Sequence, residues 1–539
     1  MAAPPCAGPS DAQLVVAGQR IMLLTKREII NSVRYLIDDT EAQALVDSGM
    51  ISIRSSVDRS FPPADGEETN LYASNIVPLA NLANHVGSYV LANFAGLTAC
   101  PTATDACATI YLDKLAPRAY RRALTADEQS RFSALYARLR APQVVNGYEV
   151  AFTVEEATGY AVSALLMSPQ MIWRWELGEP ALASTAPAGI PLTDDELATQ
   201  LAFFFTDQPP DDTLRAAASA GTLRANLSRH VEALLASQPA RDWLRTVFET
   251  YFLINQLPAV PIDQGLFPLF TNKMAADMGT EARLFLDNAL WKGNLTDLLL
   301  SRTAFLNTNL ALDIYAVPVP PGATATNFVQ TTLPADRRAG LLTNAAVLTS
   351  RGRSDGRGLV VPRGRLVQAL MCIPSATPDP TNLPTENQPL DLTSRAQVAY
   401  RAMQPACNVC HADFDPYGLA LENYDVLGRY RTADERGRPI DPHATLPASI
   451  GGGSVANGVE LAAALAAKPE FTNCLARAVL QLAMTELTAY VDVPLPPAQA
   501  GCATADVVQR YDAAGGKTFS DLIRATTAAP AFVLRRAAP

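Results

Sequence analysis

The sequence predicts a mainly α-helical protein made of several lobes. Three segments start with a capping box, in which a Thr side chain caps the first turn and a Glu three residues later bonds back. These pairs are Thr25 and Glu28, Thr125 and Glu128, and Thr193 and Glu196. Behind the first box, apolar residues recur at helical spacing at Ile29, Ile30, Val33, Leu36 and Ile37. Strand-like alternation is scarce along the chain, so we expect little sheet.

Further helices are expected wherever apolar residues keep the helical period. The segments concerned are 148–167, 196–206, 227–236, 240–253, 274–290 and 295–300. Proline, glycine and threonine concentrate near 175–190 and 318–335, and prolines recur through 373–390, which predicts an extended linker there. We therefore divide the chain into an N-terminal helical domain (1–175), a central helical domain (176–330), a connecting segment with a Pro-rich linker (331–390) and a C-terminal domain (391–539).

The composition is that of a globular protein and argues against a nucleic-acid partner. Hydrophobic residues make up 48% of the 539 residues and charged residues 18%, which lies outside the range of disordered or fibrous chains. The formal net charge of −10 provides no basic field to attract phosphate backbones. No apolar run reaches the roughly 18 residues that a membrane-spanning helix needs, so we expect no transmembrane segment.

One motif in the chain carries chemistry. Residues 403–411 read Met-Gln-Pro-Ala-Cys-Asn-Val-Cys-His and end in CxxCH, the attachment signature of c-type haem. Cys407 and Cys410 are close enough for both sulfurs to form thioethers with the vinyl groups along one haem edge. His411 then falls under the ring, where its imidazole reaches the iron. We predict one covalently attached haem c.

Three other interpretations of the motif are a chance occurrence, a disulfide and part of a zinc site. A zinc site needs a second Cys or His pair at matching spacing, and the remaining histidines, His85, His230 and His443, form no such pair. A thioredoxin-like redox pair would follow a strand in a βαβ context, which the pattern does not indicate. The haem interpretation is therefore preferred.

The segment after the motif resembles a known family. Asp415-Pro416-Tyr417-Gly418 is similar to an Asp-Pro-x-Gly turn, and the following Ala-Leu-Glu-Asn-Tyr-Asp run (420–425) ends in a Gly-x-x-Arg element at 428–431. This order resembles the haem-binding segment of the planctomycete-type cytochrome c multidomain proteins, which are exported monohaem proteins built from consecutive domains of unknown function. Blocks 119–125, 168–174, 307–311, 340–349 and 529–532 are also similar to segments of that family.

The resemblance implies an exported protein with one haem and a helical build, in which 391–539 forms a cytochrome c-like haem lobe. The sequence departs from the family at Phe414, where many relatives carry Met, and at Ser454-Val455, which replaces a Phe-containing glycine loop. Because c-type haem is attached outside the cytoplasm, we expect a periplasmic or secreted protein whose leader has been removed. In that setting the other six cysteines suggest disulfides, with Cys100–Cys107, Cys474–Cys502 and Cys6–Cys372 as the expected pairs.

The sixth iron ligand is left open by the sequence. The candidates are His443, in the loop 440–443, and Met484, in a helix expected over 475–487. The iron is otherwise five-coordinate or closed by a residue from another lobe. Tyr417 and Tyr424 are expected to line the haem pocket, since a haem plane needs apolar and aromatic walls.

Three function hypotheses follow from the motif. The first is an extracytoplasmic monohaem cytochrome that transfers electrons, with helical lobes that bind a redox partner protein or a small-molecule substrate. The second is a peroxidase- or oxygenase-like haem enzyme with an open distal face. The third is a binding or structural protein that uses haem as a structural cofactor. The long helical region before residue 391 exceeds what electron transfer alone requires, and catalytic residues and oligomeric state stay undefined.

Overall fold

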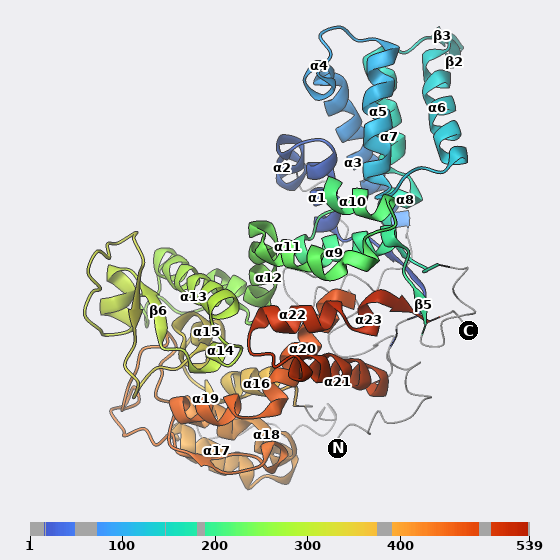
Figure 1. Ribbon diagram of the computed structural model, residues 1–539. Helices are drawn as coiled ribbons and strands as arrows, with labels where there is room; N and C mark the ends of the chain where they lie inside the picture. The colour runs from blue at the N-terminus through green and yellow to red at the C-terminus, as the bar shows by residue number, and fades with distance from the viewer. Residues whose placement is uncertain are drawn as a thin grey trace. The chain divides into compact units, whose positions relative to one another are not determined.

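The computed structural model describes residues 16, 18–48, 73–145, 147–179, 189–373, 391–484 and 497–536. Helices dominate these residues, and their strands form only two-stranded antiparallel pairs, which confirms the predicted mainly α class (Figure 1). The chain divides into two compact units. Unit 1 comprises Met1–Leu244, Gln481–Asp506 and Thr526–Pro539, and unit 2 comprises Arg245–Leu480 and Val507–Ala525.

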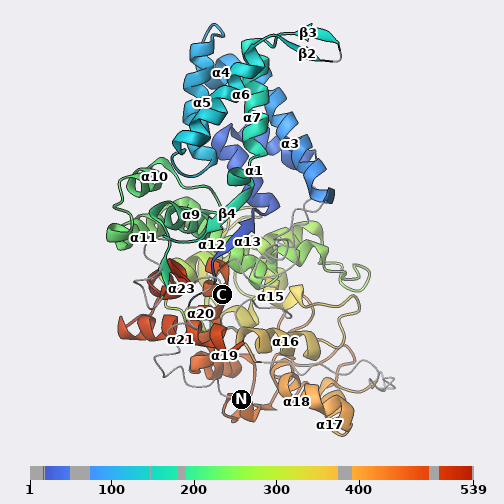
Figure 2. The ribbon, with the colours of Figure 1, turned by 90° about the vertical axis from the view of Figure 1, so that its right-hand side faces the viewer.

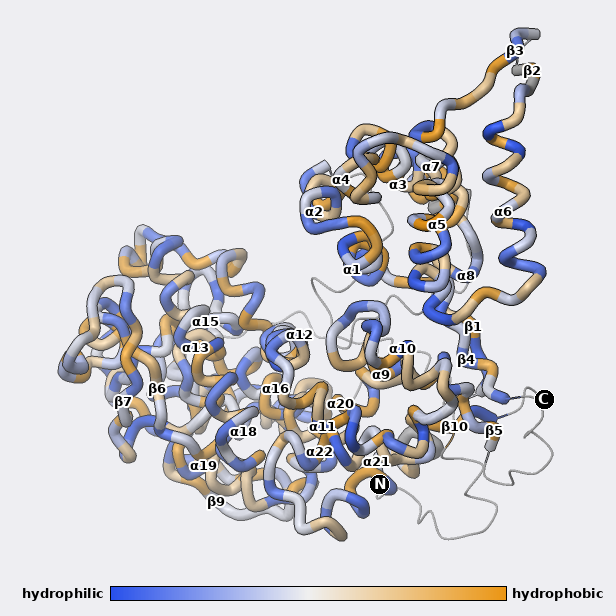
Figure 3. Tube along the Cα trace, turned by 45° about the horizontal axis from the view of Figure 1, so that its top comes forward, coloured by the Kyte–Doolittle hydropathy of each residue, from blue (hydrophilic) through white to orange (hydrophobic). Residues whose placement is uncertain are grey.

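Unit 1 is built around a bundle of helices. Its helices are α1 (Lys26–Leu36), α2 (Asp39–Asp47), α3 (Ala73–Ala92), α4 (Phe94–Thr98), α5 (Asp105–Ala119), α6 (Ala126–Arg140), α7 (Val154–Leu166), α8 (Pro169–Ile172), α9 (Asp194–Thr206), α10 (Asp212–Ser219), α11 (Leu227–Ala236) and α23 (Pro530–Val533). Helix α7 packs against α3, α5 and α6 (Figure 1). Hydrophilic and hydrophobic residues alternate along α6 (Figure 3), and Tyr136 is its buried residue.

Short antiparallel strands connect distant parts of unit 1. β1 (Arg20–Leu23) pairs with β4 (Trp173–Glu176), and β5 (Ile190–Pro191) pairs with β10 (Leu534–Arg535). β2 (Gln143–Val145) and β3 (Tyr148–Val150) form a hairpin. The helix predicted over 148–167 is therefore wrong in its first residues. Helix α7 begins only after Thr153, because Thr153 and Glu156 form a capping box there.

Unit 2 contains further helices and two strand pairs. Its helices are α13 (Asn272–Lys292), α14 (Asp297–Leu300), α15 (Ala345–Ser350), α16 (Val360–Leu370), α17 (Ser394–Ala402), α18 (Pro405–Ala420) and α19 (Gly458–Ala466). β6 (Thr303–Leu306) pairs with β7 (Val329–Thr332), and β8 (Ala444–Thr445) pairs with β9 (Ser454–Val455). Four helices contribute residues to both units: α12 (Gln238–Tyr251), α20 (Pro469–Met484), α21 (Pro497–Ala513) and α22 (Phe519–Thr527).

Helices α16, α17 and α18 lie side by side in unit 2 (Figures 1 and 2). Two glycines bring the backbones of α16 and α18 into direct contact. A Cβ added at Gly418 would lie 1.8 Å from the carbonyl oxygen of Val360, and one added at Gly364 would lie 2.1 Å from that of Phe414. Since backbone atoms cannot rotate away, any larger residue forces the two helices apart. The position of α18 in the unit thus depends on these glycines.

Gly418→Ala is expected to destabilise unit 2 by about 3 kcal/mol, because the added methyl group overlaps the backbone of α16. The measurement is hydrogen–deuterium exchange of the peptides that cover α16 and α18. Gly279→Ala is the matched control, since a Cβ there meets nothing within 4 Å and α13 gains a better helix former. Equal protection of α18 in both variants would contradict the packing argument.

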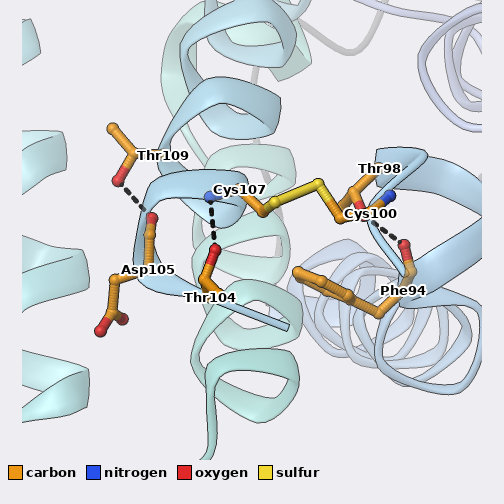
Figure 4. Close-up of a disulfide and its surroundings, with 7 residues drawn as sticks. All are labelled: Phe94, Thr98, Cys100, Thr104, Asp105, Cys107 and Thr109. Atoms are coloured by element: carbon orange, nitrogen blue, oxygen red, sulfur yellow. Dashed lines mark hydrogen bonds between the residues drawn. A yellow bond between two sulfur atoms is a disulfide. The ribbon is translucent and has the colours of Figure 1, made fainter. Parts of the chain in front are cut away.

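The predicted disulfide Cys100–Cys107 is confirmed. It joins the residues after α4 to the first turn of α5, where the Thr104 side chain accepts a hydrogen bond from the Cys107 amide (Figure 4). The other two predicted pairs are wrong, because Cys372 bonds to Cys474 with their Cα atoms 5.3 Å apart. The fold brings the end of α16 to α20 across 102 residues, whereas the prediction relied on closeness in sequence.

Cys502 is also disulfide-bonded, and Cys6 lies outside the described residues. The predicted linker over 373–390 lies outside them as well, apart from Ile373. None of the helices that the structure describes is both long enough and apolar enough to cross a membrane.

Candidate functional site

Helix α18 carries the CxxCH motif in its first two turns. Pro405 occupies the first helical position, where the missing amide hydrogen costs nothing. Residues three and four apart share one face of a helix, so Cys407, Cys410 and His411 lie on the same side of α18. Cys407 is partly exposed, Cys410 is 8% exposed, and the His411 side chain is 24% exposed. The motif therefore lies at the surface of unit 2 with its side chains gathered together.

Neither of the two motif cysteines is disulfide-bonded. All the other cysteines of the described ranges, Cys100, Cys107, Cys372, Cys474 and Cys502, are disulfide-bonded. The disulfide interpretation of the motif therefore has no support in this structure. Two adjacent thiols on one helix face are the groups that a c-type haem consumes when its vinyl groups form thioethers.

A buried carboxylate holds the imidazole of His411. Asp415, one turn further along α18, places Oδ1 3.0 Å from Nδ1 of His411. Its second oxygen, Oδ2, accepts a hydrogen bond of 2.8 Å from Nε of Arg401, which projects from α17. An ionised carboxylate only accepts hydrogen bonds, so His411 donates through Nδ1 and keeps Nε2 available as a ligand atom. This pattern is the usual one for a metal-binding histidine.

Sequence reasoning missed the roles of Asp415 and Arg401. Asp415 stands four residues after His411, a helical spacing that could have revealed it, but the family resemblance suggested a turn at 415–418. The helix instead continues through Pro416 to Ala420. Pro416 removes one hydrogen bond of the helix. In the same turn, Gly418 packs directly against the backbone of α16.

The motif is flanked by apolar side chains. Phe414 is buried with its ring centroid 4.8 Å from that of His411. The guanidinium carbon of Arg365 also lies 4.8 Å from the centroid of the Phe414 ring. Met403 and Val409 are 72% and 65% exposed. Exposed apolar side chains beside two thiols and an available imidazole nitrogen fit a large apolar ring attached at this surface.

The two tyrosines predicted to line a haem pocket are both buried. Tyr417 lies on α18, two turns after Cys410, and burial raises the pKa of its phenol above the ordinary value. The Tyr424 hydroxyl donates to the carbonyl oxygen of Arg337, and its ring packs at 5.9 Å against Tyr430 in a T-shaped arrangement. The contacts of Tyr424 are thus with the interior of unit 2, and its place beside a haem stays a prediction.

The two candidates for the sixth ligand lie in different units. His443 belongs to unit 2 and is exposed, and its backbone carbonyl accepts a hydrogen bond from Arg395 at the start of α17. Met484 ends α20, is 3% exposed and belongs to unit 1. Their roles as iron ligands stay predictions.

A buried polar cluster behind Tyr424 was not anticipated. The Glu281 carboxylate on α13 accepts hydrogen bonds from Asn344 at 2.7 Å and from the Tyr315 hydroxyl at 3.3 Å. The Arg338 guanidinium lies 4.6 Å from the centroid of the Tyr315 ring and 5.1 Å from that of Tyr424. These residues come from segments far apart in sequence, so no local pattern could have indicated the cluster.

Glu281→Gln is expected to remove a pH dependence of the stability of unit 2. Burial raises the pKa of Glu281 from 4.5 to about 7, against the opposing hydrogen bonds from Asn344 and Tyr315. Between pH 4.5 and about pH 7, the Glu281 carboxyl group therefore keeps its proton in the folded chain but has lost it in the unfolded chain. Stability therefore falls as pH rises from about 4.5 to about 7, by at most about 3 kcal/mol.

The measurement compares the unfolding of wild type and Glu281→Gln between pH 5 and pH 8. The amide retains an oxygen that accepts from Asn344 and Tyr315, so the variant should show the smaller loss of stability as pH rises. The same pH slope in both proteins would show that Glu281 does not titrate in this range.

Two segments of the chain match family models. Residues 192–317 match PSD4, described as a protein of unknown function (DUF1592), and residues 338–434 match PSCyt3, described as a protein of unknown function (DUF1588). The second segment includes all of α16, α17 and α18 and therefore the motif. No curated protein and no solved structure matches the chain. These two segments are thus similar to domains of unknown function of the planctomycete cytochrome c type.

Proposed function

We propose that the protein is an extracytoplasmic c-type cytochrome with one haem, attached through Cys407 and Cys410 and ligated by Nε2 of His411. The single observation that carries this proposal is the state of the cysteines. Every other cysteine of the described ranges is disulfide-bonded, whereas these two form no disulfide and lie on the helix face that carries His411. When bound, the haem supplies a one-electron redox centre.

Residues of α18, together with Met403 just before it, would hold the haem. Cys407 and Cys410 fix the ring to the helix, so it cannot dissociate in either oxidation state. His411 approaches the iron with an imidazole whose tautomer and orientation are set by the hydrogen bond to Asp415. Phe414 and the exposed side chains of Met403 and Val409 offer apolar surface that the ring would cover.

A zinc site is the weaker alternative. Structural zinc sites use four Cys or His ligands. Across the parts of the chain that the structure describes, no group of three or more His, Cys, Asp or Glu side chains could hold a metal ion. Two cysteines that form no disulfide and one histidine suit thioether attachment better than tetrahedral zinc binding.

The disulfides support a periplasmic or secreted location. Disulfides form and persist in oxidising compartments, and c-type haem attachment requires free thiols within the same compartment. A chain that keeps Cys407 and Cys410 reduced beside stable disulfides fits a maturation route that reserves those thiols for haem. Partners are then a redox protein or a small molecule that exchanges electrons with the haem.

The test is an absorption spectrum of the full-length protein matured in a periplasm, oxidised and dithionite-reduced, with and without carbon monoxide. Sharp reduced bands that carbon monoxide leaves unchanged indicate a six-coordinate iron and electron transfer. A high-spin spectrum that responds to carbon monoxide indicates an open distal face and a haem enzyme. Absence of haem bands would overturn the proposal.

A further inference from the structure

We propose that Asp415 is a positioning residue that orients His411 and lowers the reduction potential of the haem, with Arg401 holding its carboxylate in place. The inference rests on the haem attachment proposed above. It goes further because it assigns the control of the redox centre to two residues that bind neither the haem edge nor the iron.

The geometry gives each oxygen of Asp415 a separate partner. Oδ1 lies 3.0 Å from Nδ1 of His411, and Oδ2 lies 2.8 Å from both Nε and the terminal nitrogen Nη2 of Arg401. The Arg401 guanidinium therefore contacts Oδ2 of the carboxylate through two nitrogens, while Oδ1 faces the imidazole. This arrangement allows the imidazole little freedom to turn about its Cβ bond.

Burial makes the interaction strong. Asp415 is 1% exposed and Arg401 is 5% exposed, so water does not compete for the carboxylate. Charges at such sites act through a lower effective dielectric than at the surface. Arg401 places its positive charge directly against one oxygen of the Asp415 carboxylate. His411 thus faces a fixed negative charge on the side away from Nε2.

A carboxylate behind a metal-binding imidazole fixes its tautomer and raises its basicity as a ligand. A more basic ligand and a nearby anion both stabilise the ferric state over the ferrous state. Hydrogen bonding beyond the axial ligand is one of the means by which a protein sets a haem potential. Asp415 should therefore keep the potential low.

A purely structural role is the competing explanation, because Asp415 and Arg401 also tie α18 to α17. Asp415→Asn separates the two roles. The amide oxygen still accepts from Nδ1 of His411 and the side chain keeps its size, but the negative charge is lost. Asp415→Glu keeps the charge on a longer side chain and tests for rescue.

The matched control is Asp425→Asn in the same unit. Asp425 is 7% exposed and accepts from Nε of Arg429 at 2.6 Å, so it is a buried carboxylate paired with an arginine. Its carboxylate also accepts from the backbone amides of Leu427 and Arg429. Its replacement should disturb the fold to a comparable degree and leave the axial histidine unaffected.

The experiment is a spectroelectrochemical titration of the matured full-length chain. Asp415→Asn should shift the reduction potential to a more positive value, whereas Asp415→Glu and Asp425→Asn should stay near wild type. If the ferrous iron is five-coordinate, its resonance Raman spectrum should show a lower iron–imidazole stretching frequency in Asp415→Asn alone. Equal potentials in Asp415→Asn and Asp425→Asn would overturn the inference.

A measurement on wild type keeps the test decisive if Asp415→Asn does not mature. Proton NMR of the reduced protein should show a slowly exchanging Nδ1 proton on the axial histidine, protected by the buried carboxylate. A freely exchanging proton would overturn the inference alone. Wild-type protein without covalent haem would instead overturn the proposed function, so the two failures are distinguishable.

Discussion

Replacing both Cys407 and Cys410 with alanine is expected to abolish covalent haem attachment completely. The two thioethers are the only covalent links that the proposed site provides, and both sulfurs come from cysteines that form no disulfide and share one helix face. The measurement is the haem content of the purified protein after denaturation and acid extraction, which releases haem that is not covalently bound. The wild-type chain should retain its haem through this treatment.

The control for this double replacement is Cys100→Ala combined with Cys107→Ala. It also removes two cysteines, but they form a disulfide in unit 1. Loss of that short loop closure should cost about 2–3 kcal/mol and leave the haem attached. Retention of covalent haem by the variant without Cys407 and Cys410 would place the attachment site elsewhere.

Replacing Cys372 and Cys474 with alanine is expected to destabilise unit 2 by about 4–5 kcal/mol. The bond spans 102 residues, and the loss of loop-closure entropy from the unfolded chain grows with that length. The loop contains α17, α18 and α19, so the bond also limits the freedom of the segment that carries the motif.

Chemical denaturation followed by hydrogen–deuterium exchange of the α18 peptides measures this effect within unit 2. The variant lacking Cys100 and Cys107 should show the smaller overall loss of stability, and exchange of its α18 peptides should stay at the wild-type level, because that disulfide lies in unit 1. A loss of stability no larger than that of the short loop would contradict the loop-length argument.

The parts of the fold that depend on neighbouring residues were predictable. The capping boxes of Thr25, Thr125 and Thr193 are present as expected, because a cap is formed by residues three apart in sequence. The segment 227–236 was predicted with the bounds that α11 has. Helix α20 starts at Pro469, earlier than the predicted 475, because a proline at the first turn marks its beginning.

Features that depend on distant residues were not predictable. Cys372 and Cys474 meet because α16 and α20 approach each other, and no spacing in the sequence indicates that approach. Arg401 likewise reaches Asp415 only because α17 packs on α18. The spacing of four residues between His411 and Asp415 is local to α18, so this contact, like the CxxCH motif itself, could be predicted from the sequence.

The intact mass of the exported, full-length protein tests the central claim most directly. The sample is prepared in a host that matures a known c-type cytochrome in parallel. We expect a mass above that of the polypeptide by one haem, and a proteolytic peptide containing Cys407 and Cys410 that carries the whole increment. A chain with the unmodified mass and two titratable thiols in that peptide would contradict the account.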